Sequence, residues 1–223
     1  MNWNTYPDRD LLALDLADAL ASSLRNALAR NDRVSLAVPG GTSPGPVFDA
    51  LSTVHLDWDR VDVMLTDERW VPESSDRSNT ALLRRSLLTG PAAAATLIPL
   101  RADTATPEES LDALAATIAP LLPIDVLLVG MGADMHTASL FPGADRLDEA
   151  LSPHAPVLLP MRAPGAPEPR VTLTAPVLRG AMDTHIVIMG AEKKAAIEQA
   201  RHLTPTEAPV SVLLADATIH YAD

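Results

Sequence analysis

The chain has 223 residues, of which 47% are hydrophobic, so its length and composition predict a folded protein with a sizeable core. Its net charge of −12 argues against a nucleic-acid partner, whose phosphates require a basic surface, and the absence of cysteine excludes disulfides and thiolate metal sites. We expect a soluble cytoplasmic protein, because no apolar run approaches the roughly 20 residues of a membrane span and the first thirty residues lack a signal-peptide pattern.

The first half of the chain alternates between helix and strand patterns. Leucines at helical spacing indicate an amphipathic helix over residues 10–30. Further expected helices lie at 44–51, from Ser78-Asn79 to Leu88, and at about 107–121, and expected strands lie at 33–38, 61–66 and 96–100. Residues 39–43 are predicted to form a turn and 67–72 a loop.

The second half continues the alternation. An apolar run at 124–129 predicts a buried parallel strand, and the next helix is expected to begin near residues 134–136. After it we expect a proline-rich loop at 163–169, strands at 170–174 and 184–189, a helix carrying Lys193 and Lys194 after Gly190, and a last strand at 210–214. This order predicts an α/β fold, a doubly wound, mostly parallel sheet with helices on both faces.

The segment after residue 129 contains the strongest candidate for catalysis. Gly130 and Gly132 permit a tight turn, and loops after parallel strands hold the chemistry of α/β proteins. Asp134 and His136 follow two residues apart. A histidine with a pKa near 6.5 suits proton abstraction, so we predict that His136 is a general base, with a structural histidine or a metal ligand as the alternatives. The other histidines show no ligand spacing, so a metal site is not favoured. Met135 stands where a G-x-G-x-x-G motif has its third glycine, which argues against a dinucleotide site.

Two other segments carry candidate binding groups. Gly40-Gly41-Thr42-Ser43 lies between a strand and a helix, where free N–H groups and two hydroxyls suit a phosphate or carboxylate; a capped turn is the alternative, and a Walker A loop is excluded. Asp67-Glu68-Arg69 follows another strand. Arg69 and Arg170 are each either surface residues or bidentate ligands of an anion or oxyanion.

Taken together, these segments resemble the 6-phosphogluconolactonase family of the oxidative pentose phosphate pathway. The matching segments, in order, are Pro39–Pro44, Thr66–Pro72 with Asp76–Asn79, Gly130–Pro142, Pro169–Thr174, and Gly190 with Lys193. The resemblance covers nearly the whole chain and implies one α/β domain over residues 1–223. The family usually has glycine where this chain has Met135, and a positive φ there would cost methionine roughly 1–2 kcal/mol.

The resemblance implies hydrolysis of 6-phospho-D-glucono-1,5-lactone, a small-molecule substrate, without a metal or cofactor and without a nucleic-acid or membrane partner, in a monomer or small homo-oligomer. His136 would activate water, Asp134 or Asp67 would orient its ring, and Arg69 would stabilise the oxyanion, with Arg77 and Arg170 as other candidates. The expected substrate- and phosphate-binding residues are Gly40, Gly41, Thr42, Ser43, Asn79, Gly132, Arg170 and Lys193.

Two alternatives remain open at this point. An amino-sugar-phosphate deaminase or isomerase shares the fold and the turn, but typically continues A-F-N-E-P where this chain has Ala138-Ser139-Leu-Phe141-Pro142. A non-catalytic sugar-phosphate sensor usually carries a DNA-binding helix–turn–helix, for which this chain has no room before its first strand.

Overall fold

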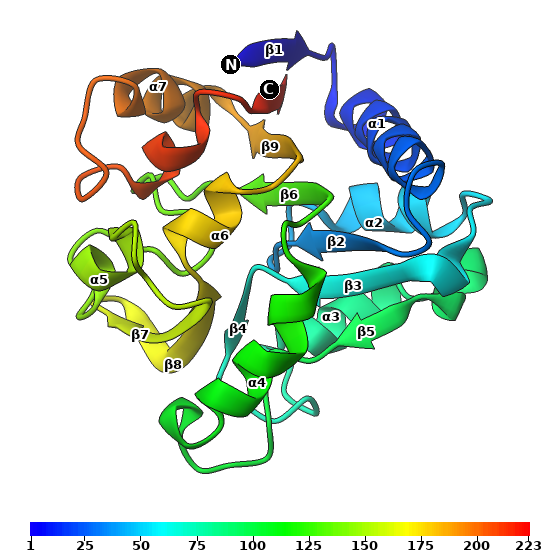
Figure 1. The fold of residues 1–223 in the computed structure, drawn as a ribbon. Coiled ribbons are helices and arrows are strands. Elements are labelled where there is room, and N and C mark those ends of the chain that lie inside the picture. Colours follow the sequence, from blue (N-terminus) through cyan, green and yellow to red (C-terminus); the bar gives the residue numbers. More distant parts are fainter.

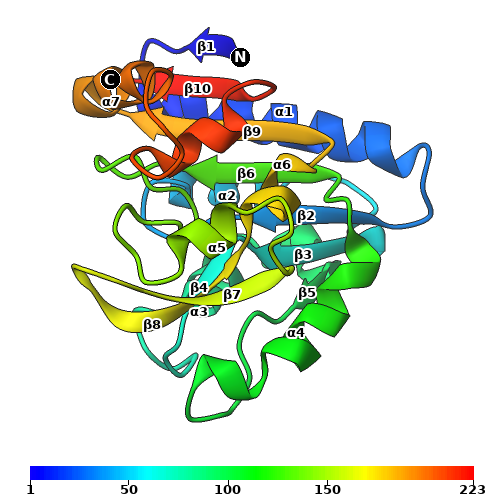
Figure 2. The same ribbon diagram turned by 60° about the vertical axis from the view of Figure 1, so that its left-hand side comes forward.

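A parallel sheet organises the molecule, and the computed structural model describes all of residues 1–223. The strands of this sheet are β1 (Asn2–Thr5), β2 (Val34–Val38), β3 (Val61–Leu65), β5 (Thr96–Ile98), β6 (Val126–Gly130), β9 (Asp183–Met189) and β10 (Thr218–Ala222). Their order is β1-β10-β9-β6-β2-β3-β5, and every neighbouring pair is parallel (Figures 1 and 2). The predicted parallel α/β architecture is therefore confirmed.

Helices cover both faces of this sheet. They are α1 (Arg9–Leu28), α2 (Gly45–Ser52), α3 (Asn79–Ser86), α4 (Leu111–Ile118), α5 (Leu147–Leu151), α6 (Ala175–Arg179) and α7 (Ala191–Ala200). Helices α1 and α2 lie on one face, and α4 and α6 lie on the other (Figures 1 and 2). The Asp8 carboxylate caps α1 by accepting the Leu11 N–H at 2.8 Å. None of the helices has both the length and the apolar character needed to cross a bilayer.

A second, antiparallel sheet contains β4 (Asp67–Arg69), β7 (Leu158–Ala163) and β8 (Ala166–Leu173), in the order β4-β8-β7. The loop expected at 67–72 therefore begins as a short strand. The loop expected at 163–169 is wrong, because these residues form the tip and arm of the β7–β8 hairpin. Proline lacks the N–H that a ladder needs, and the pairing of the hairpin shifts between Met161 and Ala163, opposite the proline-rich part of β8.

Three further expectations are corrected by the structure. Residues Pro209–Leu213 form a 3₁₀ helix, so the last strand is β10 and not 210–214. Strand β1 was not expected, because its four residues are mostly exposed and show no apolar alternation. No helix begins at 134–136, since Met135 and Ala138 have φ values of 65° and 49°, which a right-handed helix does not allow.

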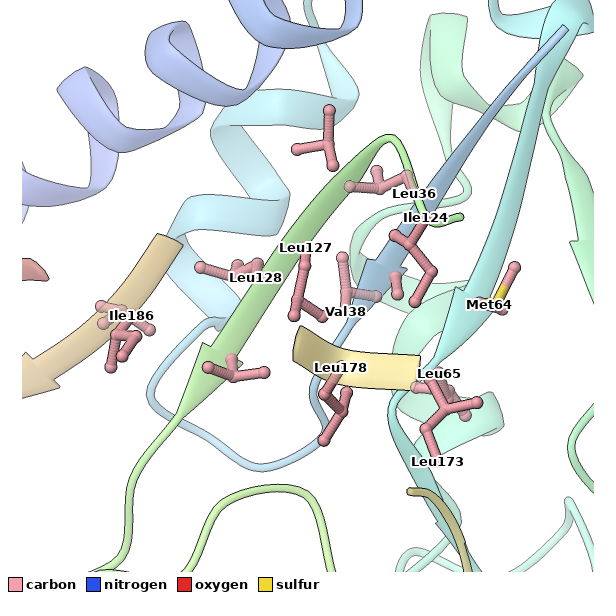
Figure 3. Close-up of a cluster of buried hydrophobic side chains, with 14 of the residues drawn as sticks. Leu36, Val38, Met64, Leu65, Ile124, Leu127, Leu128, Leu173, Leu178 and Ile186 are labelled. Atoms are coloured by element: carbon pink, nitrogen blue, oxygen red, sulfur yellow. The ribbon is translucent and has the colours of Figure 1, made fainter. Parts of the chain in front are cut away.

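The core fixes the strand ends from which the site is built. A cluster of 58 buried hydrophobic residues runs through the molecule, and β2 and β3 are buried along their whole length. Leu36 and Val38 of β2 and Leu127 of β6 are all buried in this cluster (Figure 3). Because the strands are parallel and packed in the interior, their carboxyl ends meet at one edge, and the loops that follow them are held close together.

Candidate active site

A cavity of about 280 Å³ lies where β2, β3, β6 and β9 end. Its lining residues are Pro39, Gly40, Gly41, Thr42, Ser43, Pro44, Asp67, Arg69, Asn79, Gly130, Met131, Gly132, His136, Ala138, Arg170, Val187 and Lys193. Of the residues expected at the site, only Asp134 and Arg77, an alternative to Arg69, are outside this set. Although the chain as a whole is acidic, the cavity gathers three cations (Arg69, Arg170 and Lys193) around one carboxylate, Asp67. A small anion therefore suits it.

Asp134 lies behind His136 and not in the cavity wall. Its Oδ1 accepts a hydrogen bond from Nδ1 of His136 at 2.5 Å and a second from the His136 backbone N–H at 3.2 Å. A neutral imidazole that donates from Nδ1 has an unprotonated Nε2. The pair therefore provides a ring of fixed orientation whose second nitrogen is free to take a proton.

The turn before His136 contains two positions with special backbone requirements, Gly132 and Met135. A Cβ on Gly132 would collide with the His136 ring and with the Asp134 carboxylate, so only glycine lets the backbone pass so close. Met135 has φ 65°, which lies in the left-handed region that favours glycine. The Asp134–His136 hydrogen bond is present with methionine at that position.

Asp67 contacts groups other than the histidine. Its Oδ2 accepts a hydrogen bond from Ser139 Oγ at 2.5 Å and lies 3.6 Å from Nη1 of Arg170. Both Asp67 and Arg170 are nearly inaccessible to solvent. Of the two acids predicted to orient His136, the structure thus places Asp134 against the ring and Asp67 against Arg170.

Two arginines occupy opposing positions on neighbouring strands of the small sheet. Arg69 of β4 is the register partner of Arg170 of β8, and both line the cavity. Burial lowers the pKa of the Arg170 guanidinium, the charge of Asp67 opposes this effect, and the charge of Arg69 adds to it. Like charges on opposing residues repel, so an anion in the cavity would relieve this repulsion. Arg77, the third candidate, pairs instead with Glu168 and does not line the cavity.

The loop at 39–44 forms another wall and leads into α2. Asn79, which is 2% exposed, lies beneath it, and a Cβ on Gly40 would collide with the Asn79 side chain. The Asn79 amide donates to the Asp67 carbonyl at 2.9 Å. Asn79 therefore joins the loop to β4. The backbone N–H groups of this loop and of the α2 N-terminus, together with the Thr42 and Ser43 hydroxyls, form the part of the wall best suited to a phosphate.

The two lysines of the chain have different surroundings. Lys193 is in the first turn of α7 and lines the cavity, whereas Lys194 places its ammonium 4.8 Å from the ring centroid of Tyr221. A cation near the N-terminus of a helix opposes the helix dipole. An anion bound beside Lys193 would offset that unfavourable placement.

Some residues at the site were not singled out by sequence reasoning. The Phe141 ring lies 4.4 Å from the His136 ring, centroid to centroid, and 5.6 Å from the Arg170 guanidinium carbon. Phe141 and Ser139 both belong to the segment after His136, so the motif contained the signal, although it did not show which group each side chain would contact. Val187 of β9 also lines the cavity, but the sequence offers no feature that indicates this beyond the apolar strand to which it belongs. No three His, Asp or Glu side chains are arranged to coordinate a metal ion.

The fold and the cavity together define an α/β protein with a cavity suited to a small anion at the carboxyl ends of its parallel strands. The family model described as glucosamine-6-phosphate isomerases/6-phosphogluconolactonase matches residues 7–220, and the chain belongs to this family.

Individual relatives agree with this assignment. A 6-phosphogluconolactonase of Pseudomonas aeruginosa is 44% identical over 218 residues, which cover 94% of this chain and 90% of that protein. The crystal structure of a 6-phosphogluconolactonase from Shewanella baltica superposes with a TM-score of 0.94 at 30% identity, covering 100% of this chain and 98% of that one. A monomeric glucosamine-6-phosphate deaminase shares the fold, with a TM-score of 0.82 at 14% identity, covering 99% of this chain and 97% of that one.

Proposed function

We propose that this protein hydrolyses 6-phospho-D-glucono-1,5-lactone to 6-phospho-D-gluconate, the second step of the oxidative pentose phosphate pathway. The observation that carries the proposal is the placement of the Asp134–His136 pair at a cavity lined by three cations. The 44% identity to a 6-phosphogluconolactonase supports the choice of this lactone over other anionic esters.

The substrate phosphate binds at the wall formed by Gly41, Thr42 and Ser43, and Lys193, which lines the same cavity, binds it as well. Backbone N–H groups and hydroxyls donate to the phosphate oxygens, and the ammonium neutralises part of their charge. Binding the phosphate at this wall holds the lactone ring so that C1 faces His136. Arg170, which Asp67 holds in place, adds positive charge on the remaining side.

The chemical step is general-base hydrolysis. Nε2 of His136 takes a proton from water as the water oxygen adds to C1, while Asp134 stabilises the imidazolium that forms. Arg69 donates to the oxyanion of the tetrahedral intermediate, an interaction of a kind worth about 3–4 kcal/mol in studied enzymes. The intermediate collapses by breaking the bond between C1 and the ring oxygen, and His136 returns the proton to that oxygen. The product is the open-chain acid.

The direct test is a coupled assay. Glucose-6-phosphate dehydrogenase generates the lactone in place, and 6-phosphogluconate dehydrogenase reports the product as NADPH. Because the lactone also hydrolyses unaided, the rate is compared with buffer, with His136→Ala, and with His154→Ala as an exposed histidine control. We expect acceleration by the wild type and by the control, and its loss in His136→Ala with binding of 6-phosphogluconate largely retained.

Other outcomes would indicate a different function. Ammonia release from an amino-sugar phosphate would indicate a deaminase. Binding of 6-phosphogluconate without any acceleration by the folded wild type would indicate a sensor and would refute the proposal.

A further inference from the structure

Glu68 is a fully buried carboxylate between two residues of the candidate site. It is 0% exposed, and its neighbours in β4, Asp67 and Arg69, both line the cavity. Side chains alternate across a strand, so Glu68 points away from the cavity and toward the start of α3. It cannot touch the substrate, and the reaction proposed above assigns it no part.

Five donors surround the Glu68 carboxylate. Oε1 accepts the backbone N–H of Arg69 at 2.7 Å and that of Asn79 at 2.8 Å. Oε2 accepts the Thr80 N–H and the Thr80 hydroxyl, both at 2.7 Å, and the Ser78 hydroxyl at 3.3 Å. All five are uncharged groups. The carboxylate therefore joins β4 to the first residues of α3 through hydrogen bonds that its own charge strengthens.

These bonds fix Arg69 at two places. The backbone of Arg69 is held directly, by its N–H on Oε1 of Glu68. The guanidinium is held indirectly, because its Nη1 donates at 2.7 Å to the carbonyl oxygen of Arg77, which is the residue before the Ser78-Asn79-Thr80 segment that Glu68 binds. One buried carboxylate thus contacts the Arg69 backbone directly and the chain segment that follows the Arg77 carbonyl.

We infer that Glu68 is a positioning residue that acts through Arg69, holding the guanidinium where the oxyanion of the reaction forms. This inference rests on the proposed lactonase activity. A displacement of about 1 Å at a catalytic group lowers the rate by up to about 100-fold, so precise placement of Arg69 has a measurable value.

Glu68→Gln tests the inference with an isosteric change. Each carboxylate oxygen accepts at least one backbone N–H, so either orientation of the glutamine amide sets its NH₂ against a backbone donor. We expect kcat to fall by about 10- to 100-fold. The change in KM should be smaller, because Arg69 acts on the oxyanion, whereas Glu68 reaches the phosphate wall only through the backbone N–H of Asn79. Asp62→Asn is the matched control. Asp62 is also a buried carboxylate, but it lies in the first half of β3, away from the cavity, and accepts a hydrogen bond from Arg33. Its kcat per folded molecule should equal that of the wild type.

Loss of folded protein is separated from loss of positioning by calorimetry. The number of 6-phosphogluconate sites per chain gives the folded fraction, and kcat is expressed per site. If Glu68→Gln does not fold, Thr80→Val replaces it, since this change removes one donor to Glu68 and keeps the Thr80 backbone N–H. We expect the smaller perturbation to lower kcat severalfold.

A double-mutant cycle with Arg69→Ala decides the inference. If Glu68 acts through Arg69, Glu68→Gln (or Thr80→Val) lowers kcat in the wild type and has no further effect once Arg69 is alanine. Losses that multiply in the double variant, or an unchanged kcat per site in the single variant, would overturn the inference while leaving the lactonase activity standing. A wild type that fails to accelerate hydrolysis would instead refute the proposed function itself, and the inference with it.

Discussion

Replacing Met135 by glycine and by alanine separates the backbone energy of this position from the packing of its side chain. Met135 has φ 65°, its N–H donates to the Gly132 carbonyl at 3.0 Å, and its carbonyl accepts the Val210 N–H at 3.1 Å. The side chain is partly buried against the core. Both variants lose this packing, but only glycine removes the conflict between a Cβ and a left-handed backbone.

The two effects predict an unusual order of stability. A left-handed residue other than glycine costs about 1–2 kcal/mol, whereas glycine loses about 0.4–1 kcal/mol more conformational entropy than alanine on folding. Met135→Gly should therefore be more stable than Met135→Ala by about 0.5–1 kcal/mol, the reverse of the order found at ordinary positions. Loss of a half-buried methionine is worth about 1 kcal/mol, which places Met135→Ala about 1 kcal/mol below the wild type and Met135→Gly within about 1 kcal/mol of it.

Urea unfolding of the three proteins at one pH measures these differences, provided that the denaturant slopes agree. Activity provides an independent check. The turn is held by backbone hydrogen bonds, including one of 3.0 Å from the Gly132 N–H to the His136 carbonyl, so kcat of Met135→Gly should stay within about threefold of the wild type. An alanine variant more stable than the glycine variant would show that the backbone at 135 is not left-handed, and the reasoning would fail.

Four further predictions concern the site and the pH dependence of stability. Gly132→Ala should lower kcat at least about 100-fold with little change in KM, because the new Cβ displaces the His136 ring; a kcat equal to that of the wild type in the coupled assay would contradict this. Lys193→Ala should raise KM about tenfold or more and lower kcat less, if the ammonium binds the ground state and the transition state alike; an unchanged KM would exclude that role. Burial lowers the pKa of His220 from 6.5 to about 4, so between these pH values the unfolded chain takes up a proton that the folded chain does not. The free energy of unfolding should therefore fall by up to about 3 kcal/mol as the pH is lowered from 6.5 to 4. His220→Gln should flatten this pH dependence, which urea unfolding at several pH values measures. Below that range the pKa of Asp183 matters, because the His185 ring, whose Nε2 is 3.3 Å from the carboxylate, lowers this pKa to about 2. A further loss of stability is therefore expected as the pH falls from 3.8 toward 2.

Much of the fold follows from local sequence. Continuous apolar runs bounded by glycine, proline or charge marked β2, β3 and β6, because a strand buried on both faces contains few polar residues. The chemistry-bearing segments at 39–44, 67–72 and 130–142 lie directly after those strands, so the same runs located these segments in the chain. The elements that failed lacked such a local signal: β1 is mostly exposed, and the β7–β8 hairpin carries prolines beside a shift in pairing.

The sequence by itself determined which residues would be available at the site, since parallel strands bring their carboxyl ends, and the loops after them, to one edge. Only the tertiary structure decided what each of them touches. Asp67 bonds Ser139, 72 positions away along the chain, whereas Asp134 holds His136, and Arg77 pairs with Glu168 outside the cavity. Periodicity and turn chemistry are local properties, but a side-chain contact depends on which strands pair and in which register. That register is set by packing across the whole core, so no single segment of the sequence contains it.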